Sequence, residues 1–313
     1  MVLISSISKD ISTNDVIDWF NFFDIKWMRI NYEDNYFFQF GENGLVISNK
    51  GSFAESGDIT SYWFRRGKLS FKNLDNKQDG FYSDQVIQKQ KEIIDEYLQF
   101  HLAQKISIGG CENSEPNKLI VLEEAKKTGL NIPVSFVVEK KEDLINLLKG
   151  GTNLITKTIA GSSMYQFRDG VGLIYTNPVN KELVDKAPDE FFPSLIQYEI
   201  QKKYELRIFF LGDKFWAMAI FSQKDDQTKG DYRRYNQEKG NRNVPFLLPD
   251  DLKEKLYKLM SKLGLNCGSI DLIVSTDNTY YFLEVNPIGQ FGNVSHICNF
   301  QLEKEVAQKL CEK

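Results

Sequence analysis

Two β-rich runs flank a polar turn at Gly268-Ser-Ile-Asp-Leu-Ile-Val-Ser275, Thr276-Asp-Asn-Thr279 and Tyr280-Tyr-Phe-Leu-Glu-Val-Asn-Pro287. The central Asp-Asn pair suits the positive φ that tight hairpins require. A hairpin centred on this pair places Asp271 directly opposite Glu284, with Cβ atoms roughly 5 Å apart. Asn286 follows Glu284 by two residues, so it shares the same face of the hairpin.

Two like charges in direct opposition destabilise a hairpin unless something compensates them. A divalent cation or a shared proton would do so. Asp271, Glu284 and Asn286 all offer oxygen ligands of the kind that Mg²⁺ takes together with phosphate oxygens. The alternative is a solvated edge hairpin, which apolar neighbours such as Leu272 and Phe282 disfavour. We therefore expect a metal site at these three residues.

The composition sets outer limits on function. The chain has 313 residues, a formal net charge of −4, 42% hydrophobic residues and 13% aromatic residues. It is therefore expected to be globular, and nothing in its charge favours nucleic-acid binding. No apolar run reaches the roughly 18 residues of a membrane span. The N-terminus does not resemble a signal peptide, and four widely separated cysteines predict neither a disulfide framework nor a zinc site. We expect a cytoplasmic location.

The chain has two histidines, His101 and His296. A Ser-His-Asp hydrolase or a His-rich metal site would have to use one of them, so carboxylates, lysines, arginines and backbone groups must carry most of the chemistry. His101 lies on the apolar stripe of a helix expected over residues 83–101, where a structural role is the commoner one. His296 is a candidate general base, with a structural role as the alternative.

Breaker residues between Gly109 and Pro116 predict a domain boundary. Beyond it strands and helices alternate with short links, which favours α/β or α+β layering. Residues 224–243 hold almost no aliphatic side chain, so we expect a mobile loop there. Arg233 and Arg234 in this loop either close over a phosphorylated intermediate or are solvated.

Several cations interrupt apolar surroundings. Lys157 ends a strand before a loop of small residues, which suits phosphate binding, although a strand lysine that faces water is commoner. Lys118 lies in the first turn of a helix, where amides favour anions. Arg207 follows Glu205 by two residues in an apolar strand. It is either a structural partner of Glu205 or a bidentate ligand for a carboxylate or phosphate.

The order of these residues resembles the ATP-grasp superfamily of carboxylate–amine ligases. It runs Lys118, Lys157, Gln197–Ile200, Arg207, Asp271 and Glu284-Val-Asn286-Pro287. Further stretches are similar to a narrower group, the microviridin-ligase-like graspetide synthetases of "grasp-with-spasm" clusters. They are Ser61-Tyr-Trp-Phe-Arg-Arg-Gly67, Asn117-Lys-Leu, Ala125, Gly129-Leu-Asn-Ile-Pro133, Asp231-Tyr-Arg233 and Asn286-Pro-Ile-Gly-Gln-Phe-Gly292.

This resemblance implies an α+β ATP-grasp fold. An N-terminal α/β pre-ATP-grasp domain would span residues 1–112, a central α+β lid 113–194 and a C-terminal antiparallel-sheet domain 195–313.

The resemblance also implies a role for each site residue. Lys118 and Lys157 would bind the phosphates of ATP. The metal ligands Asp271, Glu284 and Asn286 would hold Mg²⁺.

A hinge strand of Gln197, Tyr198, Glu199 and Ile200 would contact adenine, with Glu205 near the ribose or the metal. The acidic residue expected early in the hinge is displaced here, which leaves its register open by one residue. Arg207 and Arg233 would contact the acceptor carboxylate or the transferred phosphoryl group.

The implied activity is ATP-dependent macrocyclisation of a ribosomal precursor peptide. Asp or Glu side chains would be activated as acyl phosphates and joined to Thr or Ser hydroxyls or Lys amines, releasing ADP and phosphate. The alternatives are a ligase that adds amino acids to a protein or small molecule, and a non-catalytic nucleotide-binding scaffold. The expected partner is the precursor's leader plus core, with Arg65 and Arg66 as candidate leader contacts. A homodimer is an option, and nucleic acid and membrane are not expected partners.

Overall fold

The computed structural model describes residues 1–41, 44–49, 51–67, 81–160, 164–167, 170–173, 175–223 and 240–312. In this described part the chain divides into two compact units. Unit 1 comprises Met1–Ser114 together with Pro287–Lys313, and unit 2 comprises Glu115–Asn286. The C-terminal segment therefore returns to the unit in which the chain begins, whereas the finer division at residues 112 and 194 stays a prediction.

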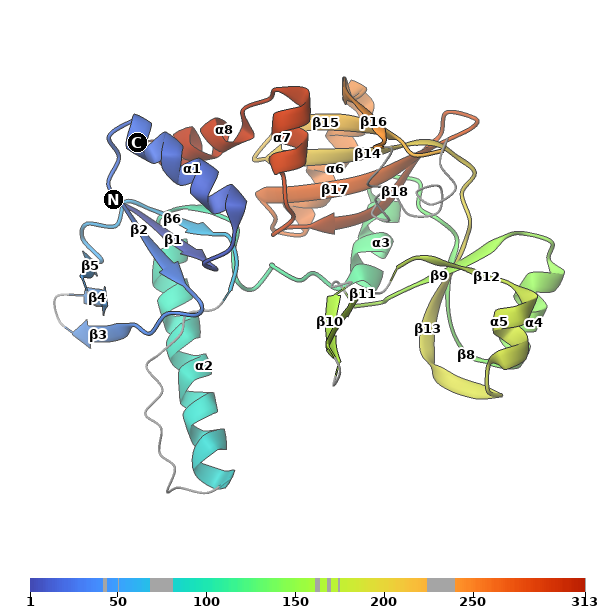
Figure 1. Ribbon diagram of the computed structural model, residues 1–313, viewed down its shortest axis with the longest axis horizontal. Coiled ribbons are helices and arrows are strands. Elements are labelled where there is room, and N and C mark those ends of the chain that lie inside the picture. Colours follow the sequence, from blue (N-terminus) through green and yellow to red (C-terminus); the bar gives the residue numbers. More distant parts are fainter. Residues whose placement is uncertain are drawn as a thin grey trace. The chain divides into compact units, whose positions relative to one another are not determined.

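Unit 1 is built on a parallel sheet with the strand order β2-β1-β6-β7 (Figure 1). Its elements are β1 (Val2–Ser6), α1 (Ile11–Phe22), β2 (Trp27–Asn31), β3 (Phe37–Gly41), β4 (Gly44–Asn49), β5 (Ser52–Glu55), β6 (Ser61–Phe64), α2 (Phe81–Ala103), β7 (Ile106–Ile108), α7 (Gly292–Cys298) and α8 (Leu302–Leu310). Every residue of β1 and of β6 is buried, as expected for central parallel strands covered on both faces. The side chain of Asp10 caps α1 by accepting from the Thr13 amide.

A second, antiparallel sheet in unit 1 has the order β3-β4-β5. Its first two strands form an antiparallel hairpin. Alternate residues of β4, Leu45 and Ile47, are buried in a core that also holds Tyr62 of β6 and Leu98 of α2. Because alternate side chains of a strand share one face, these buried residues of β4 pack the small sheet against the rest of unit 1.

Unit 2 contains a four-stranded antiparallel sheet with the strand order β12-β9-β13-β8. Its elements are β8 (Ser135–Lys140), α4 (Lys141–Lys149), β9 (Leu154–Lys157), β12 (Asn177–Val179), α5 (Lys181–Lys186) and β13 (Glu190–Tyr198). A separate hairpin pairs β10 (Met164–Phe167) with β11 (Gly170–Leu173). Leu144 of α4 and Val184 of α5 pack with Ile196 of β13, so both helices bury their apolar sides on this sheet.

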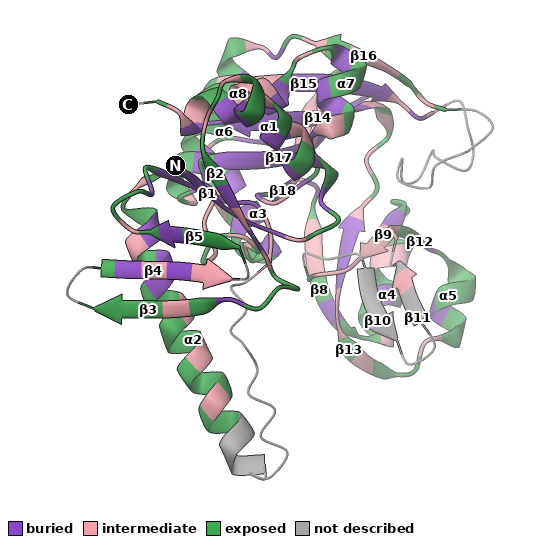
Figure 2. Ribbon diagram, turned by 60° about the vertical axis from the view of Figure 1, so that its left-hand side comes forward, coloured by how far each residue is buried: buried purple, intermediate pink, exposed green. Residues whose placement is uncertain are grey.

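The second sheet of unit 2 is antiparallel, with the order β16-β15-β14-β17-β18. Its elements are α3 (Lys118–Lys127), β14 (Lys202–Leu211), β15 (Lys214–Phe221), β16 (Arg242–Phe246), α6 (Asp250–Lys262), β17 (Cys267–Ser275) and β18 (Tyr280–Asn286). One face packs on α3 and α6, where Leu206 and Ile270 meet Leu122 and Leu256. Figure 2 shows the buried residues that run along β14 and β17. The opposite face carries the polar side chains.

Every helix within the described residues is too short or too polar to span a lipid bilayer. The long amphipathic helix expected over residues 83–101 is confirmed as α2. Pro249 occupies the N-cap of α6.

Candidate active site

The polar side chains of the second sheet of unit 2 share one face. Residues 206, 208 and 210 of β14 point into the core, so the alternating residues Glu205 and Arg207 lie on the other side. Asp271 is directly opposite Arg207, and Glu284 is directly opposite Asp271. Asn286 is opposite Ser269 at the end of β18. We call the side that carries these five residues, Glu205, Arg207, Asp271, Glu284 and Asn286, the polar face.

The predicted opposition of Asp271 and Glu284 is confirmed, but the hairpin reaches it by an irregular route. The pairs near the turn, such as Leu272 with Phe282, are shifted by one residue from the expected register. An irregularity between Asp271 and Leu272 leaves Leu283 as an extra residue on β18 and restores the register at the acids. Phe282 therefore enters the core while Glu284 stays on the polar face.

Asp271 lies against a cation from the neighbouring strand. Nη1 of Arg207 donates to both carboxylate oxygens of Asp271, at 2.9 and 2.7 Å, and both side chains are largely buried. A charge-assisted pair of this kind stabilises both charges in a site of reduced polarity. The alternative in which Arg207 serves as the partner of Glu205 is therefore wrong.

Glu284 also lies against a cation. Lys118 is the first residue of α3, and its Nζ lies 3.0 Å from Oε2 of Glu284 with 7% of the side chain exposed. The same Nζ donates to the carbonyl oxygen of Thr158 at 3.2 Å, so α3, β18 and the chain just after β9 meet at one ammonium group. Lys157, half-buried at the end of β9, directly precedes Thr158. The structure thus places the predicted phosphate ligand Lys118 in contact with the predicted metal ligand Glu284. The second predicted phosphate ligand, Lys157, is the chain neighbour of Thr158, which accepts from Lys118.

Two opposed carboxylates do not here depend on a metal ion or a shared proton, because Arg207 and Lys118 supply positive charge. The expected compensation of the two acids by positive charge is thus supplied at least in part by the chain itself, and the metal site stays a prediction. The amides at the start of α3 are also less available to an anion than expected. Asn117 Oδ1 already accepts from the amides of Leu119 and Ile120, which reduces what this helix end offers to an anion.

Glu205 is the most deeply buried acid of the polar face. Its Oε1 lies 2.6 Å from Nζ of Lys202, and its Oε2 accepts from Oγ of Ser222 at 2.7 Å. Burial raises the pKa of Glu205 above its ordinary value, and this outweighs the lowering effects of Lys202 and Ser222.

Sequence reasoning missed Lys202. Residues three apart face opposite sides of a regular strand, so Lys202 and Glu205 would not be expected to meet. The register irregularity between Lys202 and Tyr204 brings them together. The position of such a register shift cannot be predicted dependably from a single sequence.

The predicted hinge residues lie at the end of β13 and just beyond it. Gln197 is buried and donates from Nε2 to Ser135 Oγ at 2.8 Å. The amides of Tyr198 and Glu199 donate to the carbonyl oxygens of Val134 and Asn153. Glu199 and Ile200 belong to the link that precedes β14, so the hinge is only partly a strand.

Arg233 lies outside the described residues, as do Arg234 and most of the loop expected over residues 224–243. The small residues 161–163 after Lys157 also lie outside them. The predicted roles of these residues stay predictions.

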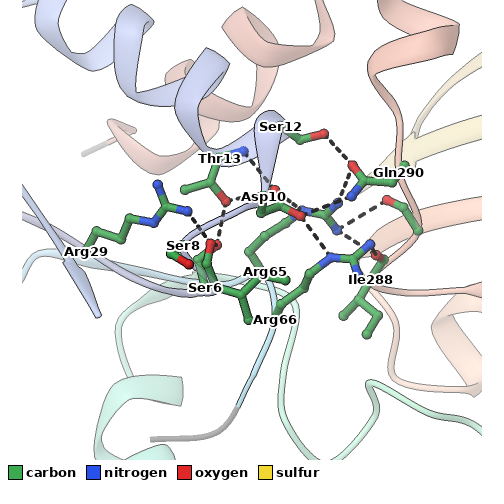
Figure 3. A network of polar contacts seen from close by, with 12 residues as sticks. Ser6, Ser8, Asp10, Ser12, Thr13, Arg29, Arg65, Arg66, Ile288 and Gln290 are labelled. Atoms are coloured by element: carbon green, nitrogen blue, oxygen red, sulfur yellow. Dashed lines mark hydrogen bonds and ion pairs between the residues drawn. The ribbon is translucent and has the colours of Figure 1, made fainter. Parts of the chain in front are cut away.

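Arg65 and Arg66 are held inside unit 1 by Asp10 (Figure 3). Arg65 has 3% of its side chain exposed, and it donates to the carbonyl oxygens of Ile288 and Gly289. Gln290 Nε2 donates to the second oxygen of Asp10. A buried guanidinium with this many partners is not a surface contact for a leader peptide, so that hypothesis is wrong for Arg65.

The fold and the polar face together define an ATP-grasp enzyme, and comparison with known proteins agrees. The model of the RimK-like ATP-grasp domain matches residues 116–310. This match covers more than half of the chain, and the chain therefore belongs to the RimK-like ATP-grasp family.

The curated relatives include alpha-aminoadipate–LysW ligases LysX. That of Sulfolobus acidocaldarius is 24% identical over 209 residues, which are 63% of this chain and 70% of the relative. That of Saccharolobus solfataricus is 24% identical over 207 residues, which are 64% of this chain and 70% of the relative.

Two solved structures are similar over nearly the whole chain. One is the macrocyclase MdnC of Microcystis aeruginosa MRC bound with the precursor peptide MdnA, at 25% identity and a TM-score of 0.82, covering 99% of each chain. The other is a RiPP-associated ATP-grasp ligase of Chryseobacterium gregarium in complex with ADP and a leader and core peptide. It has 22% identity and a TM-score of 0.85, and the match covers 99% of this chain and 96% of that one. The expected ATP-grasp fold and the expected class, an ATP-grasp ligase, are confirmed.

Proposed function

We propose that this chain is an ATP-dependent macrocyclase of a ribosomal precursor peptide. One observation carries the proposal, namely how well the whole chain superposes on a macrocyclase. The likeness spans 99% of both chains, unit 1 included, at a TM-score of 0.82. A D-cycloserine synthetase is covered to a similar extent but reaches a TM-score of only 0.55. The better superposition favours a shared kind of substrate, because the ATP-grasp fold alone is common to many ligases.

The polar face fits a nucleotide–metal site by its chemistry. Asp271, Glu284 and Asn286 offer three side-chain oxygens on one face, the donor type that hard divalent cations prefer. In the proposal these residues hold Mg²⁺, which when bound neutralises phosphate oxygens. Lys118 and Lys157 bind the phosphates, and Arg207 and Arg233 contact the acceptor carboxylate or the transferred phosphoryl group.

The hinge assignment is sharpened by the backbone bonds. The amides of Tyr198 and Glu199 already donate hydrogen bonds within unit 2, so they are not available to adenine. Within the described residues, no backbone carbonyl accepts from the amides of Ile200 or Gln201. We assign the adenine contact to the Ile200 end of the segment Gln197, Tyr198, Glu199 and Ile200. Glu205 supports the ribose side through its network with Lys202.

The proposed reaction has two steps. An Asp or Glu carboxylate of the core peptide attacks the γ-phosphorus of ATP, and the bond to the β-phosphate oxygen breaks to release ADP. A Thr or Ser hydroxyl, or a Lys amine, of the same peptide then attacks the acyl carbon, and phosphate leaves. The nucleophile's proton passes to water or to a base. Arg207 and Lys118 act mainly by electrostatic stabilisation of the phosphoryl oxygens.

The direct test combines purified protein, Mg·ATP and a candidate precursor peptide, chosen from short reading frames beside the gene. We expect ADP release that depends on the peptide, together with a peptide mass lower by one water for each ring. ADP release without any change in peptide mass would contradict macrocyclisation.

Site variants connect this activity to the polar face. We expect Glu284→Gln to lower kcat/KM about 100-fold or more, because the charge of an electrostatic catalytic group is lost. Glu123→Gln removes an exposed acid of α3 that pairs with Lys127, so it should leave turnover unchanged. Full activity of Glu284→Gln would rule out the metal assignment.

The LysX relatives favour a second candidate, an ATP-grasp ligase that joins a free amino acid to an acceptor protein. The same assay distinguishes the two. ADP release driven by free amino acids without the precursor peptide would support the second candidate, whereas release with no acceptor at all would support neither. Reduced cysteines and the need for ATP favour a cytoplasmic location for either one.

A further inference from the structure

A cluster of metal-ligating side chains lies in unit 1, outside the residues that the proposed function uses. It consists of Asp15 on α1, His296 on α7 and Glu303 on α8. Nε2 of His296 lies 3.7 Å from Oδ2 of Asp15 and 4.0 Å from Oε1 of Glu303. One ligand atom from each of the three side chains lies within 4.8 Å of the other two. Helices α1 and α7 both pack against α8, so tertiary packing builds the cluster (Figure 1).

Glu303 is the unusual member of this cluster. Its side chain is 5% exposed, and Ser295 donates a short hydrogen bond to Oε2. Within the described residues, Oε1 is buried and has no hydrogen-bond partner. Burying a carboxylate oxygen without a partner costs free energy. Nε2 of His296 lies 4.0 Å from this oxygen, which is too far for a hydrogen bond.

We propose that Asp15, His296 and Glu303 bind a first-row divalent transition cation. An imidazole nitrogen with two carboxylate oxygens matches Zn²⁺, Co²⁺ or Mn²⁺ better than Mg²⁺, which prefers oxygen alone. A bound cation satisfies the orphaned oxygen of Glu303 and neutralises the two acids.

Bonds of about 2.0–2.2 Å to a tetrahedral ion place neighbouring ligand atoms roughly 3.3–3.6 Å apart. The separations of 3.7 and 4.0 Å from His296 Nε2 are somewhat longer, so binding requires the ligands to move inward. Asp15 is partly exposed and His296 is exposed, so these two side chains have room to move. Glu303 is held in place because Ser295 also accepts from the Leu302 amide at the start of α8. Three protein ligands around a four-coordinate ion leave one coordination position for water.

The consequence is a link between the two ends of the chain. Asp15 comes from the N-terminal part of unit 1, and the other two ligands come from its C-terminal segment. A cation bound only by the folded arrangement stabilises it by mass action. The site is independent of the proposed activity, because none of its ligands lies on the polar face.

Cobalt titration tests the site directly. Full-length protein is titrated with Co²⁺ at neutral pH in excess Mg²⁺ and without nucleotide, so that oxygen-only sites are filled. We expect visible d–d bands that saturate at one Co²⁺ per chain and disappear when Zn²⁺ is added. The bands should lack the near-ultraviolet charge transfer of thiolate ligation. Zn²⁺ should also raise the Tm.

Matched variants separate this cluster from other sites. His296→Ala and Glu303→Gln should each abolish the saturable bands and the Tm increase. His101→Ala, which removes the other histidine of the chain, and Asp271→Asn, which alters the polar face, should retain both. Asp15→Asn should weaken Co²⁺ binding at least tenfold. It alters a partly exposed group, so loss of the fold does not confound the result.

Two results would overturn the proposal. One is the absence of saturable Co²⁺ binding to the folded wild-type chain, which would make the cluster a set of polar contacts between helices and not a metal site. The other is unchanged binding by His296→Ala. Neither outcome bears on whether Glu284→Gln lowers ligase activity, so the two proposals fail separately.

Discussion

At the scale of single residues, Asp10 shows how much one buried charge organises. Its carboxylate is fully buried, with Nε of Arg65 at 3.3 Å and Nε of Arg66 at 2.9 Å. The Thr13 amide donates to the same group at 2.9 Å. Asp10 therefore caps α1 and pairs with two guanidinium groups at once.

Asp10→Asn should lower the free energy of unfolding by about 3–5 kcal/mol, because it leaves buried guanidinium charge uncompensated. Equilibrium urea unfolding measures this change. Glu182→Gln is the matched control, since it breaks an exposed pair with Lys186 and should change stability by less than about 0.5 kcal/mol. Equal effects of the two variants would contradict the importance assigned to Asp10.

The pH dependence of stability follows from the same group. Burial alone would raise the pKa of Asp10, but Arg65, the Thr13 amide and Arg66 together hold it below its ordinary value of 3.8. A depressed folded pKa means that the stabilisation is complete above the ordinary pKa and is lost as the pH falls through the folded value. The stability difference between wild type and Asp10→Asn should therefore shrink as the pH falls below about 4. Chemical unfolding at a series of pH values measures it, and a constant difference would contradict this origin.

At the scale of elements, the β17–β18 hairpin depends on its turn. Asn278 has a φ of +66°, and Lys203 Nζ donates to its side-chain oxygen at 2.9 Å. A β-branched residue pays about 1–2 kcal/mol in this left-handed region. We expect Asn278→Val to destabilise the protein by that amount, whereas Asn278→Gly should be nearly neutral because glycine adopts positive φ freely. Thermal unfolding compares the two, and an equal loss in both would assign the effect to the lost Lys203 contact.

At the scale of the whole molecule, the chain order of the units predicts how fragments behave. Unit 2 is one continuous segment, Glu115–Asn286, whereas unit 1 needs both ends of the chain. Residues 1–114 alone would lack the Ile288 and Gly289 carbonyls that accept from Arg65, and the α8 surface against α1. We expect fragment 115–286 to unfold cooperatively by circular dichroism. Fragment 1–114 should do so only when it is joined or mixed with residues 287–313. Cooperative unfolding of 1–114 alone would contradict this dependence.

Local chemistry was enough to predict much of the fold and the candidate site. The turn at Asp277 and Asn278 and the alternation on either side predicted the opposition of Asp271 and Glu284, because strand period and turn type are short-range properties. Helical periodicity likewise predicted α2. Where strand alternation, turn type or helical periodicity is clear, the local sequence is enough to predict the element.

The sequence by itself therefore determined the hairpin, its acidic pair and the class of the protein, an ATP-grasp ligase. The tertiary structure alone decided which cations meet those acids, that Lys202 reaches Glu205, and that Arg65 is buried. It also brought Asp15, His296 and Glu303 together. The physical reason is range: register irregularities, ion pairs between distant strands and the return of the C-terminal segment depend on packing between residues that no local period connects.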